Sequence, residues 1–375
     1  MGPYPNDRIG NYRVEAELGP SGAGLLIQAQ HIVLPRRVII KVVHPAFAHA
    51  QPYVLQTLRE ACILEAIAHP GVPVVYESGV LRDRRPWFAL EVINGPTLDD
   101  LLVPGALPVI DVAGLVRDLA DLLEHAHRRG VIHRGLRPDR IVITADRRYP
   151  LCIPDWSEAI AHDATSHLPA SPSESGQFYL APEMAGGELD LAVPPFNNPA
   201  VDDRVDMFAL GAIAYRALTG VLPFDQPADG DERRSDRDGL YVRAGERRPD
   251  APAELCAIID SLLSFDRFDR PSASEVRADL DWLFETLPSL TVRSQRRESP
   301  QISQVQRHTA VQKDLRRGNV ALDVRTQRDL ARIIEQPRLR RPRWTPDVHH
   351  LESRIEQTKS SLPGTHSIED DRTKD

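Results

Sequence analysis

Two charged side chains, Lys41 and Glu60, are of types that together hold a phosphate chain. Lys41 ends the apolar run Val38-Ile39-Ile40, a pattern typical of a strand. Glu60 follows 19 positions later on a predicted helix, and apolar residues three, four and seven positions beyond it place it on the buried face. Because a buried carboxylate needs a cationic partner, we expect these side chains to form an ion pair. This ion pair either orients a phosphate-bearing ligand or only stabilises the fold.

The segment Leu18-Gly19-Pro20-Ser21-Gly22-Ala23-Gly24 lies between two strand patterns upstream of Lys41. Glycines leave backbone N–H groups open to a phosphate chain, because no side chain stands in the way. Glycine-rich hairpins are also common as plain turns. By itself, therefore, this segment does not identify a phosphate site.

The elements that must position these residues divide at Asn94-Gly95-Pro96. Before this break, the pattern predicts short antiparallel strands within 11–45, 72–76 and 87–93, and one helix at 53–68. After it, the pattern predicts helices at 111–129, 206–218, 253–263 and 274–287, and a hairpin from 141–144 and 151–153. We therefore predict an α+β fold with two lobes, a small antiparallel lobe at 11–94 and a mostly helical lobe at 95–287.

Charge and composition set the two ends of the chain apart from these lobes. Residues 1–10 are read as a polar lead, and residues 288–375 as a basic tail that is disordered or partly helical. The overall net charge is −8, yet residues 291–350 hold 14 Lys/Arg against 6 Asp/Glu. The acidic body argues against nucleic acid as a partner. The tail is a solvated linker, a segment docked on its own body, a partner site or a nucleic-acid contact.

Metal-binding and membrane signals are weak in this sequence. Cys62, Cys152 and Cys256 lie far apart, and the histidines His125, His127 and His133 are read as helix-end and core residues, so we expect no zinc site. A membrane span needs roughly 18 consecutive apolar residues, and we find no such segment. The cytoplasm is the expected compartment.

Five motifs in order resemble those of the protein-kinase family, and most closely the bacterial Ser/Thr kinases, from about Asn11 to Leu287. They are the strand ending in Lys41, Glu60, the loop His133-Arg134-Gly135-Leu136-Arg137-Pro138-Asp139-Arg140, Asp155-Trp156-Ser157 and Ala181-Pro182-Glu183. The resemblance implies that nucleotide contacts lie at Leu18, Gly19, Ser21, Gly22, Gly24, Leu26, Ile39, Lys41, Glu60, Glu91, Ile93 and Asp155. It also implies a buried stack of Leu64, His133 and Trp156, an ion pair of Glu183 with Arg270, and an anchor for the catalytic loop at Asp206.

The departures from the family pattern fall where phosphoryl transfer needs chemistry. Gly135 stands where the family has the aspartate that accepts the substrate proton, and loss of a positioned base costs on the order of 10²- to 10⁴-fold. Arg140 replaces the asparagine that ligates magnesium, and Arg137 replaces a lysine. Ser175 and Gly176 occupy the Gly-Thr positions of the substrate-docking loop. No intact catalytic residue is therefore expected.

Nucleotide binding is a separate question, because Lys41, Glu60 and Asp155 are all present. Asp155 is the one residue left that could ligate a metal. Our hypothesis is that Arg140 pairs directly with Asp155 and that its guanidinium stands in for Mg²⁺. Mg²⁺-independent ATP binding, or no ATP binding, follows from this hypothesis, and Mg²⁺ is the less expected cofactor.

The sequence thus favours a pseudokinase that acts by binding a protein partner, which is another kinase or the substrate of one. The main rival is an active Ser/Thr kinase in which another group replaces the missing base. For that rival, the nearest carboxylate in the sequence is Asp139, which in the family points away from the cleft. A third alternative is a kinase fold that catalyses another nucleotide transfer, against which Arg140 also counts.

Overall fold

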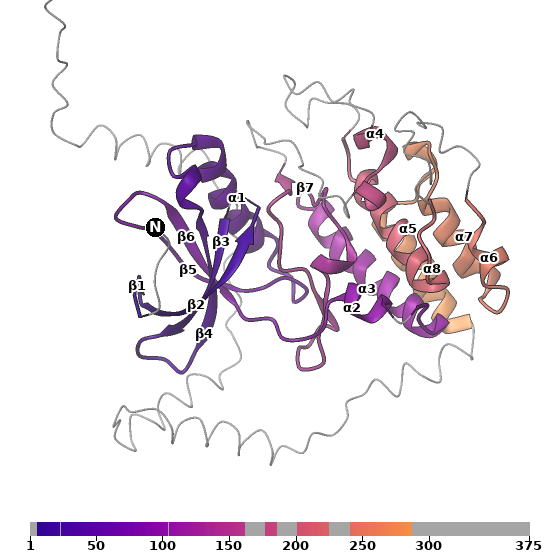
Figure 1. Cartoon of the computed structure of the whole chain (residues 1–375). Helices are drawn as coiled ribbons and strands as arrows, with labels where there is room; N and C mark the ends of the chain where they lie inside the picture. Colours follow the sequence, from indigo (N-terminus) through magenta and orange to yellow (C-terminus); the bar gives the residue numbers. More distant parts are fainter. Residues whose placement is uncertain are drawn as a thin grey trace, which may run out of the picture.

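The computed structural model describes residues 6–22, 24–103, 105–161, 177–185, 201–224 and 241–286. These residues form two lobes, a sheet with one long helix and a larger helical part (Figure 1). The predicted α+β division is confirmed. The tail at 288–375, the loop position Ser175-Gly176 and most of the segment between Glu183 and Asp206 lie outside the described residues.

One antiparallel sheet of six strands, in the order β1-β2-β3-β4-β6-β5, forms the small lobe. Its strands are β1 Arg8–Ile9, β2 Tyr12–Ser21, β3 Gly24–His31, β4 Arg37–Val43, β5 Val75–Val80 and β6 Pro86–Glu91. Strand β1 pairs with β2, so the sheet begins inside the segment expected to be a lead. Strand β5 starts at Val75 rather than at Val72, because the N–H of Val72 closes a turn onto the carbonyl of His69 at 3.0 Å.

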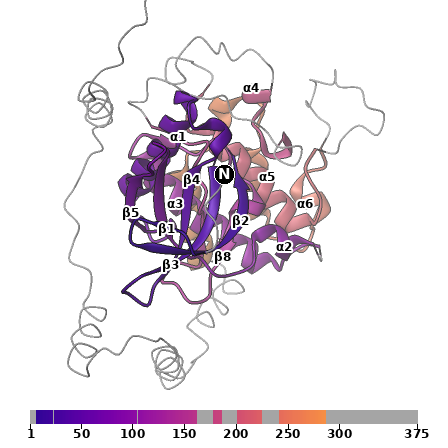
Figure 2. The ribbon, with the colours of Figure 1, turned by 60° about the vertical axis from the view of Figure 1, so that its left-hand side comes forward.

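Helix α1, Gln51–Ile67, lies beside this sheet (Figure 2). Glu60 lies on its buried face together with Ile63, Leu64 and Ile67, as the apolar spacing predicted. The residue after the helix, Ala68, has a left-handed backbone with φ of 45° and ends it. The helix therefore carries one buried carboxylate toward the sheet on an otherwise apolar face.

The larger lobe is built on helices that pack around one buried helix. Its helices are α2 Leu98–Leu102, α3 Val109–His127, α4 Pro182–Ala185, α5 Arg204–Thr219, α6 Ala244–Arg247, α7 Ala253–Leu262 and α8 Ala273–Thr286. Helix α5 is buried along almost its whole length, and Gly211 lets α7 approach, because a Cβ there would lie 2.7 Å from the Cβ of Leu262. None of the described helices is long and apolar enough to cross a membrane.

Two short antiparallel ribbons in this lobe carry the loops that matter for chemistry. Strand β7, Val131–Ile132, pairs with β10, Ile160–Ala161, and β8, Val142–Ile143, pairs with β9, Leu151–Cys152. The predicted hairpin is confirmed. The ribbons bring the loop at 133–141 next to the segment at 153–159.

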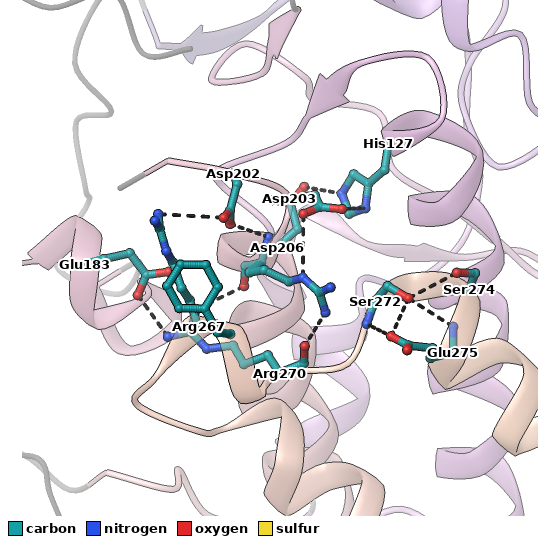
Figure 3. A network of polar contacts seen from close by, with 12 residues as sticks. His127, Glu183, Asp202, Asp203, Asp206, Arg267, Arg270, Ser272, Ser274 and Glu275 are labelled. Atoms are coloured by element: carbon teal, nitrogen blue, oxygen red, sulfur yellow. Dashed lines mark hydrogen bonds and ion pairs between the residues drawn. The ribbon is translucent and has the colours of Figure 1, made fainter. Parts of the chain in front are cut away.

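A polar network beneath these loops ties the larger lobe together (Figure 3). Arg270 is fully buried and donates to both oxygens of Glu183, at 2.6 and 2.9 Å, which confirms the predicted ion pair. It also donates to the carbonyls of Ser264, Phe265 and Arg204. With its donors so fully used, Arg270 fixes the end of α4 against the loop before α8.

Replacing Arg270 with methionine is therefore expected to lower the free energy of unfolding by roughly 3–5 kcal/mol, because a buried Glu183 carboxylate would lose its partner. Urea unfolding measures this change. The exposed pair of Arg37 and Glu15, at 3.3 Å, provides the control, and Arg37→Met should cost about 0–1 kcal/mol. Equal losses in the two variants would contradict the assigned role of Arg270.

Candidate functional site

Lys41 is the side chain on which the two lobes meet. Strand β4 places its Nζ 2.7 Å from one oxygen of Glu60 on α1, and 3.2 Å from Oδ1 of Asp155 in the larger lobe. Lys41 and Glu60 are almost fully buried. Burial alone would lower the pKa of Lys41, but the charges of Asp155 and Glu60 raise it above its usual value. The predicted ion pair of Lys41 with Glu60 is therefore present, and Lys41 is held charged.

Asp155 lies just beyond β9 and receives a cation from each side. Lys41 and the backbone N–H of Ser157 contact Oδ1 at 3.2 Å, and Nε of Arg140 lies 3.3 Å from Oδ2. Burial opposes the charge of this carboxylate, yet Lys41 and Arg140 hold the pKa of Asp155 well below its usual value. The ion pair of Arg140 with Asp155 that the sequence suggested is thus present.

Arg140 has a second and closer carboxylate partner in Glu158, which the sequence reasoning missed. Nη2 of Arg140 lies 2.6 Å from Oε1 of Glu158, and Nη1 donates to the carbonyl of Gly135 at 3.3 Å. Both charged side chains are largely buried, with 13% and 15% of their side-chain surfaces exposed. Arg140 therefore lies between two carboxylates and is closer to Glu158 than to Asp155.

Gly135 leaves the space into which these two side chains reach. A Cβ at this position would lie 2.6 Å from Nη1 of Arg140 and 2.8 Å from Oε2 of Glu158. Both distances are shorter than real Cβ contacts, so any side chain at residue 135 would have to displace one of them. The carboxylate nearest to Gly135 is thus Glu158 and not Asp139, which pairs with Arg137 at 2.9 Å.

The glycine-rich segment forms the turn that joins β2 to β3. Gly19 and Gly22 have φ values of 122° and 57°, which L side chains rarely adopt. Gly24 is buried under Lys41, and a Cβ there would come within 3.3 Å of that side chain. Ser21 pairs with Gly24 across the turn. The glycines are thus required by the backbone and by the close approach to Lys41.

The sheet face that carries Lys41 also carries two of the predicted apolar nucleotide contacts. Leu26 pairs with Lys41 and Ile39 pairs with Gln28, so Leu26, Ile39 and Lys41 share a face. Both apolar side chains are partly exposed there. Leu18 is 51% exposed. An apolar strip therefore runs beside the charged cluster on the side open to solvent.

The connection between the lobes is held by Arg147, a residue that the sequence did not single out. Its Nη1 lies 2.6 Å from the carboxylate of Glu91, and its Nη2 donates to the carbonyls of Pro70 and Val72. Glu91 also accepts from the N–H of Val74. The Glu91 side chain therefore holds structural partners on the larger lobe and at Val74.

The loop at 133–135 is anchored from below by Asp206 on α5. Its fully buried carboxylate accepts from the backbone N–H groups of His133 and Arg134, both at 2.8 Å, and lies 2.9 Å from Nε2 of His127. Arg134 has φ of 61°, so the anchor holds a left-handed residue in place. The predicted anchor is confirmed.

The predicted contact of His133 with Trp156 is present, with the two rings tilted by 54° rather than stacked. The rings of His133 and Trp156 lie 4.5 Å apart between centroids, and Leu64 belongs to the same hydrophobic cluster as Trp156. The indole Nε1–H donates to the carbonyl of Ile153 at 2.9 Å, and the backbone N–H of Trp156 donates to Glu60 at 3.2 Å. The site is thus supported from the core and from α1.

Comparison with known proteins agrees with this geometry. Residues 12–282 match the family model described as the protein kinase domain. The chain belongs to the protein kinase family. Within this kinase fold, Lys41 and Glu60 are the paired lysine and glutamate, and the loop at 133–140 is the catalytic loop.

The relatives of this kinase domain are bacterial Ser/Thr kinases. It is 33% identical over 227 residues to the Ser/Thr-protein kinase Pkn2 of Myxococcus xanthus, which covers 58% of this chain and 25% of that protein. It is 29% identical to PknB of Mycobacterium leprae over 285 residues, 74% of this chain and 43% of that protein. The chain therefore spans less than half the length of these relatives.

Solved structures support the same fold. The kinase domain of Mycobacterium tuberculosis PknI shares 24% identity with this kinase domain, with a TM-score of 0.53. The match covers 76% of this chain and 100% of that one. At this identity the likeness establishes the fold alone.

Asp206 is expected to stabilise this kinase fold in a pH-dependent way. Burial opposes its charge, but the hydrogen bond with His127 and the backbone N–H of His133 hold the pKa of Asp206 below its usual value. Its contribution is then fully present above about pH 4 and is lost as the pH falls through the folded-state pKa. Asp206→Asn should therefore cost about 3 kcal/mol from pH 8 to pH 5 and less below pH 4.

Urea unfolding of both proteins across this pH range measures the difference. The exposed Asp279 on α8 provides the control, and Asp279→Asn should leave the profile unchanged. A loss for Asp206→Asn that grows toward acid pH would contradict the assignment.

Proposed function

We propose that this kinase domain is a pseudokinase, in which the metal site is filled by Arg140 and phosphoryl transfer is lost. The observation that carries the proposal is the position of Arg140 between Asp155 and Glu158, at 3.3 and 2.6 Å, next to a Gly135 that has no side chain to act as a base. A kinase needs a positioned base and a metal that bridges the phosphates. Here the base and one of the two metal ligands are replaced.

Magnesium fits these residues poorly. The metal prefers oxygen ligands in octahedral geometry, and a kinase supplies them from the aspartate at 155 and an asparagine at 140. Here a guanidinium lies 3.3 Å from the only one of these two ligands that remains. A divalent cation at Asp155 would meet a fixed positive charge, so Arg140 must move before the metal binds.

ATP itself fits better than its metal. Lys41 is charged and paired, Gly24 lets the backbone approach it closely, and Leu26 and Ile39 supply an apolar strip on the same face. Lys41 would hold the phosphates and the strip would hold the base, while the turn at Gly19 and Gly22 would cover the chain. Nucleotide binding by this domain is therefore proposed to be independent of Mg²⁺.

The domain is proposed to act by binding a protein, either another kinase or the substrate of one. The support is that the residues for transfer at 135 and 140 are replaced, whereas the structural contacts of the fold are retained. These contacts are Lys41 with Glu60, His133 with Trp156, and Glu183 with Arg270. A framework without transfer still presents a defined surface. The cytoplasm remains the predicted compartment, and nucleic acid remains a disfavoured partner.

An active kinase remains the second candidate, because of one specific contact. The carboxylate of Glu158 lies 2.8 Å from the place where a Cβ of residue 135 would be, so it is the group that could replace the missing base. In this reading Glu158 would have to leave Arg140 and accept the proton of a substrate hydroxyl. This candidate requires both a metal site and a free Glu158.

Incubation of the protein with γ-labelled ATP, Mg²⁺ or Mn²⁺ and generic acceptors separates the two candidates. We expect no label transfer above that of the Lys41→Ala variant, because the base and one metal ligand are replaced. Transfer by the wild-type protein that Lys41→Ala abolishes would defeat the pseudokinase proposal. Its additional loss in Glu158→Gln would identify Glu158 as the base.

Replacing Arg140 with asparagine should restore a metal requirement. The substitution removes the guanidinium from Asp155 and returns an oxygen ligand, so ATP binding should become at least about tenfold tighter with Mg²⁺ than without it. The wild-type protein should bind with little or no dependence on Mg²⁺. Isothermal titration with ATP in Mg²⁺ and in EDTA measures both, and a strong Mg²⁺ requirement of the wild type would overturn the proposal.

A further inference from the structure

Glu158 is a charged side chain of the cleft to which the family pattern assigns no role, and the proposed pseudokinase function uses it only as a partner of Arg140. Its contact with Arg140, 2.6 Å, is shorter than the contact of Arg140 with Asp155, 3.3 Å. It lies only three residues beyond Asp155, in the segment that leads into β10. The side chain that stands in for the metal is thus held by an acid from outside the usual metal ligands.

The backbone of Glu158 is fixed independently of its side chain. Nε of Arg134 donates to the carbonyl of Glu158 at 2.8 Å, and the N–H of Ala159 closes a turn onto the carbonyl of Trp156 at 3.0 Å. One residue earlier, Gln56 of α1 donates to the carbonyl of Ser157 at 2.7 Å. Anchors on both sides therefore aim the Glu158 carboxylate at Arg140.

These contacts use all three nitrogen atoms of the Arg140 guanidinium. Nε faces Asp155, Nη1 donates to the carbonyl of Gly135, and Nη2 faces Glu158. A guanidinium between two carboxylates presents no net positive charge to a third anion. In this arrangement Arg140 fills the metal position without offering a metal's charge to a phosphate chain.

We propose that Glu158 is a positioning residue that withholds Arg140 from the phosphates of a nucleotide, so that the cleft favours an uncharged or weakly charged ligand over ATP. The inference rests on the proposed function, because it takes Arg140 as the cation at the metal position. It adds that the carboxylate of Glu158 controls how strongly Arg140 attracts the phosphates of a nucleotide. Release of Glu158 would turn a neutralised cleft into one that attracts phosphate.

Gly135 belongs to the same unit, because the contact of Arg140 with Glu158 requires its missing side chain. A methyl group there would come within 2.6 Å of Nη1 and 2.8 Å of Oε2, so it must push the two side chains aside. The residues at 135, 140 and 158 are thus geometrically coupled. Gly135 leaves the space that the side chains of Arg140 and Glu158 occupy, and Glu158 holds Arg140 there.

The test is metal-free binding of ATP and of adenosine to the full chain in EDTA, by isothermal titration. In Glu158→Gln we expect ATP to bind at least about tenfold more tightly than to the wild type, because Nη2 is freed for a charged acceptor. Adenosine has no phosphate, so its affinity should stay unchanged. In an Arg140→Gln background, the same change at Glu158 should alter ATP affinity by no more than about twofold.

Asp281 on α8 provides a matched control, because its carboxylate also pairs with arginines, Arg117 at 2.6 Å and Arg277 at 3.4 Å. Asp281→Asn removes the same charge and should leave ATP affinity unchanged. Gly135→Ala provides a second variant, because its methyl group would displace Arg140 and Glu158 without removing a charge. It should also tighten ATP binding, and it serves as the test if Glu158→Gln does not fold.

Unchanged or weaker ATP binding in folded Glu158→Gln would overturn the inference, as would an equal gain for adenosine. This outcome is distinct from failure of the proposed function, which is read from label transfer and the Mg²⁺ requirement of the wild type. If the wild type binds no ATP, a Glu158→Gln variant that binds it supports the inference, and one that does not bind it contradicts it.

Discussion

The charge of Asp155, whose side chain is only 22% exposed, is the constraint on which the rest of the cleft depends. A carboxylate at this depth is stable only if cations approach it, and here one comes from each lobe, Lys41 from the sheet and Arg140 from the catalytic loop. Lys41 in turn needs Glu60, which places α1 against the sheet. The contact between the two lobes at this point is therefore balanced by charges of the chain itself.

The same balance explains why the departures from the kinase pattern belong together. A guanidinium is far larger than the amide of an asparagine, so Arg140 needs space and a second acceptor once it faces Asp155. Gly135 provides the space and its own carbonyl, and Glu158 provides the acceptor. An aspartate restored at residue 135 alone would meet both side chains. The missing base is one part of a rearranged charge network.

Much of this architecture followed from local patterns in the sequence. The buried face of α1, the hairpin of β8 and β9, and the pair of Lys41 with Glu60 were predicted from periodicity and charge, whereas the pair of Glu183 with Arg270 was predicted from the resemblance to the kinase family. Arg147 was missed because its partners Glu91, Pro70 and Val72 come from distant parts of the chain, whereas Glu158 was missed because the kinase pattern assigns no role to that position. Strand β1 was missed because a two-residue strand, Arg8–Ile9, leaves almost no alternating pattern. A carboxylate three residues after Asp155, opposite an arginine and a glycine, was the available signal.

The framework beneath the cleft does not include the residues that carry out phosphoryl transfer in kinases. Asp206 binds the backbone of His133 and Arg134, and the contact of His133 with Trp156 is a matter of packing. Neither interaction involves the side chain at residue 135. Removing the base therefore costs the fold little, whereas removing Asp206 would release the loop. The anchor at Asp206 and the contact of His133 with Trp156 therefore hold the loop in place whichever side chain stands at residue 135.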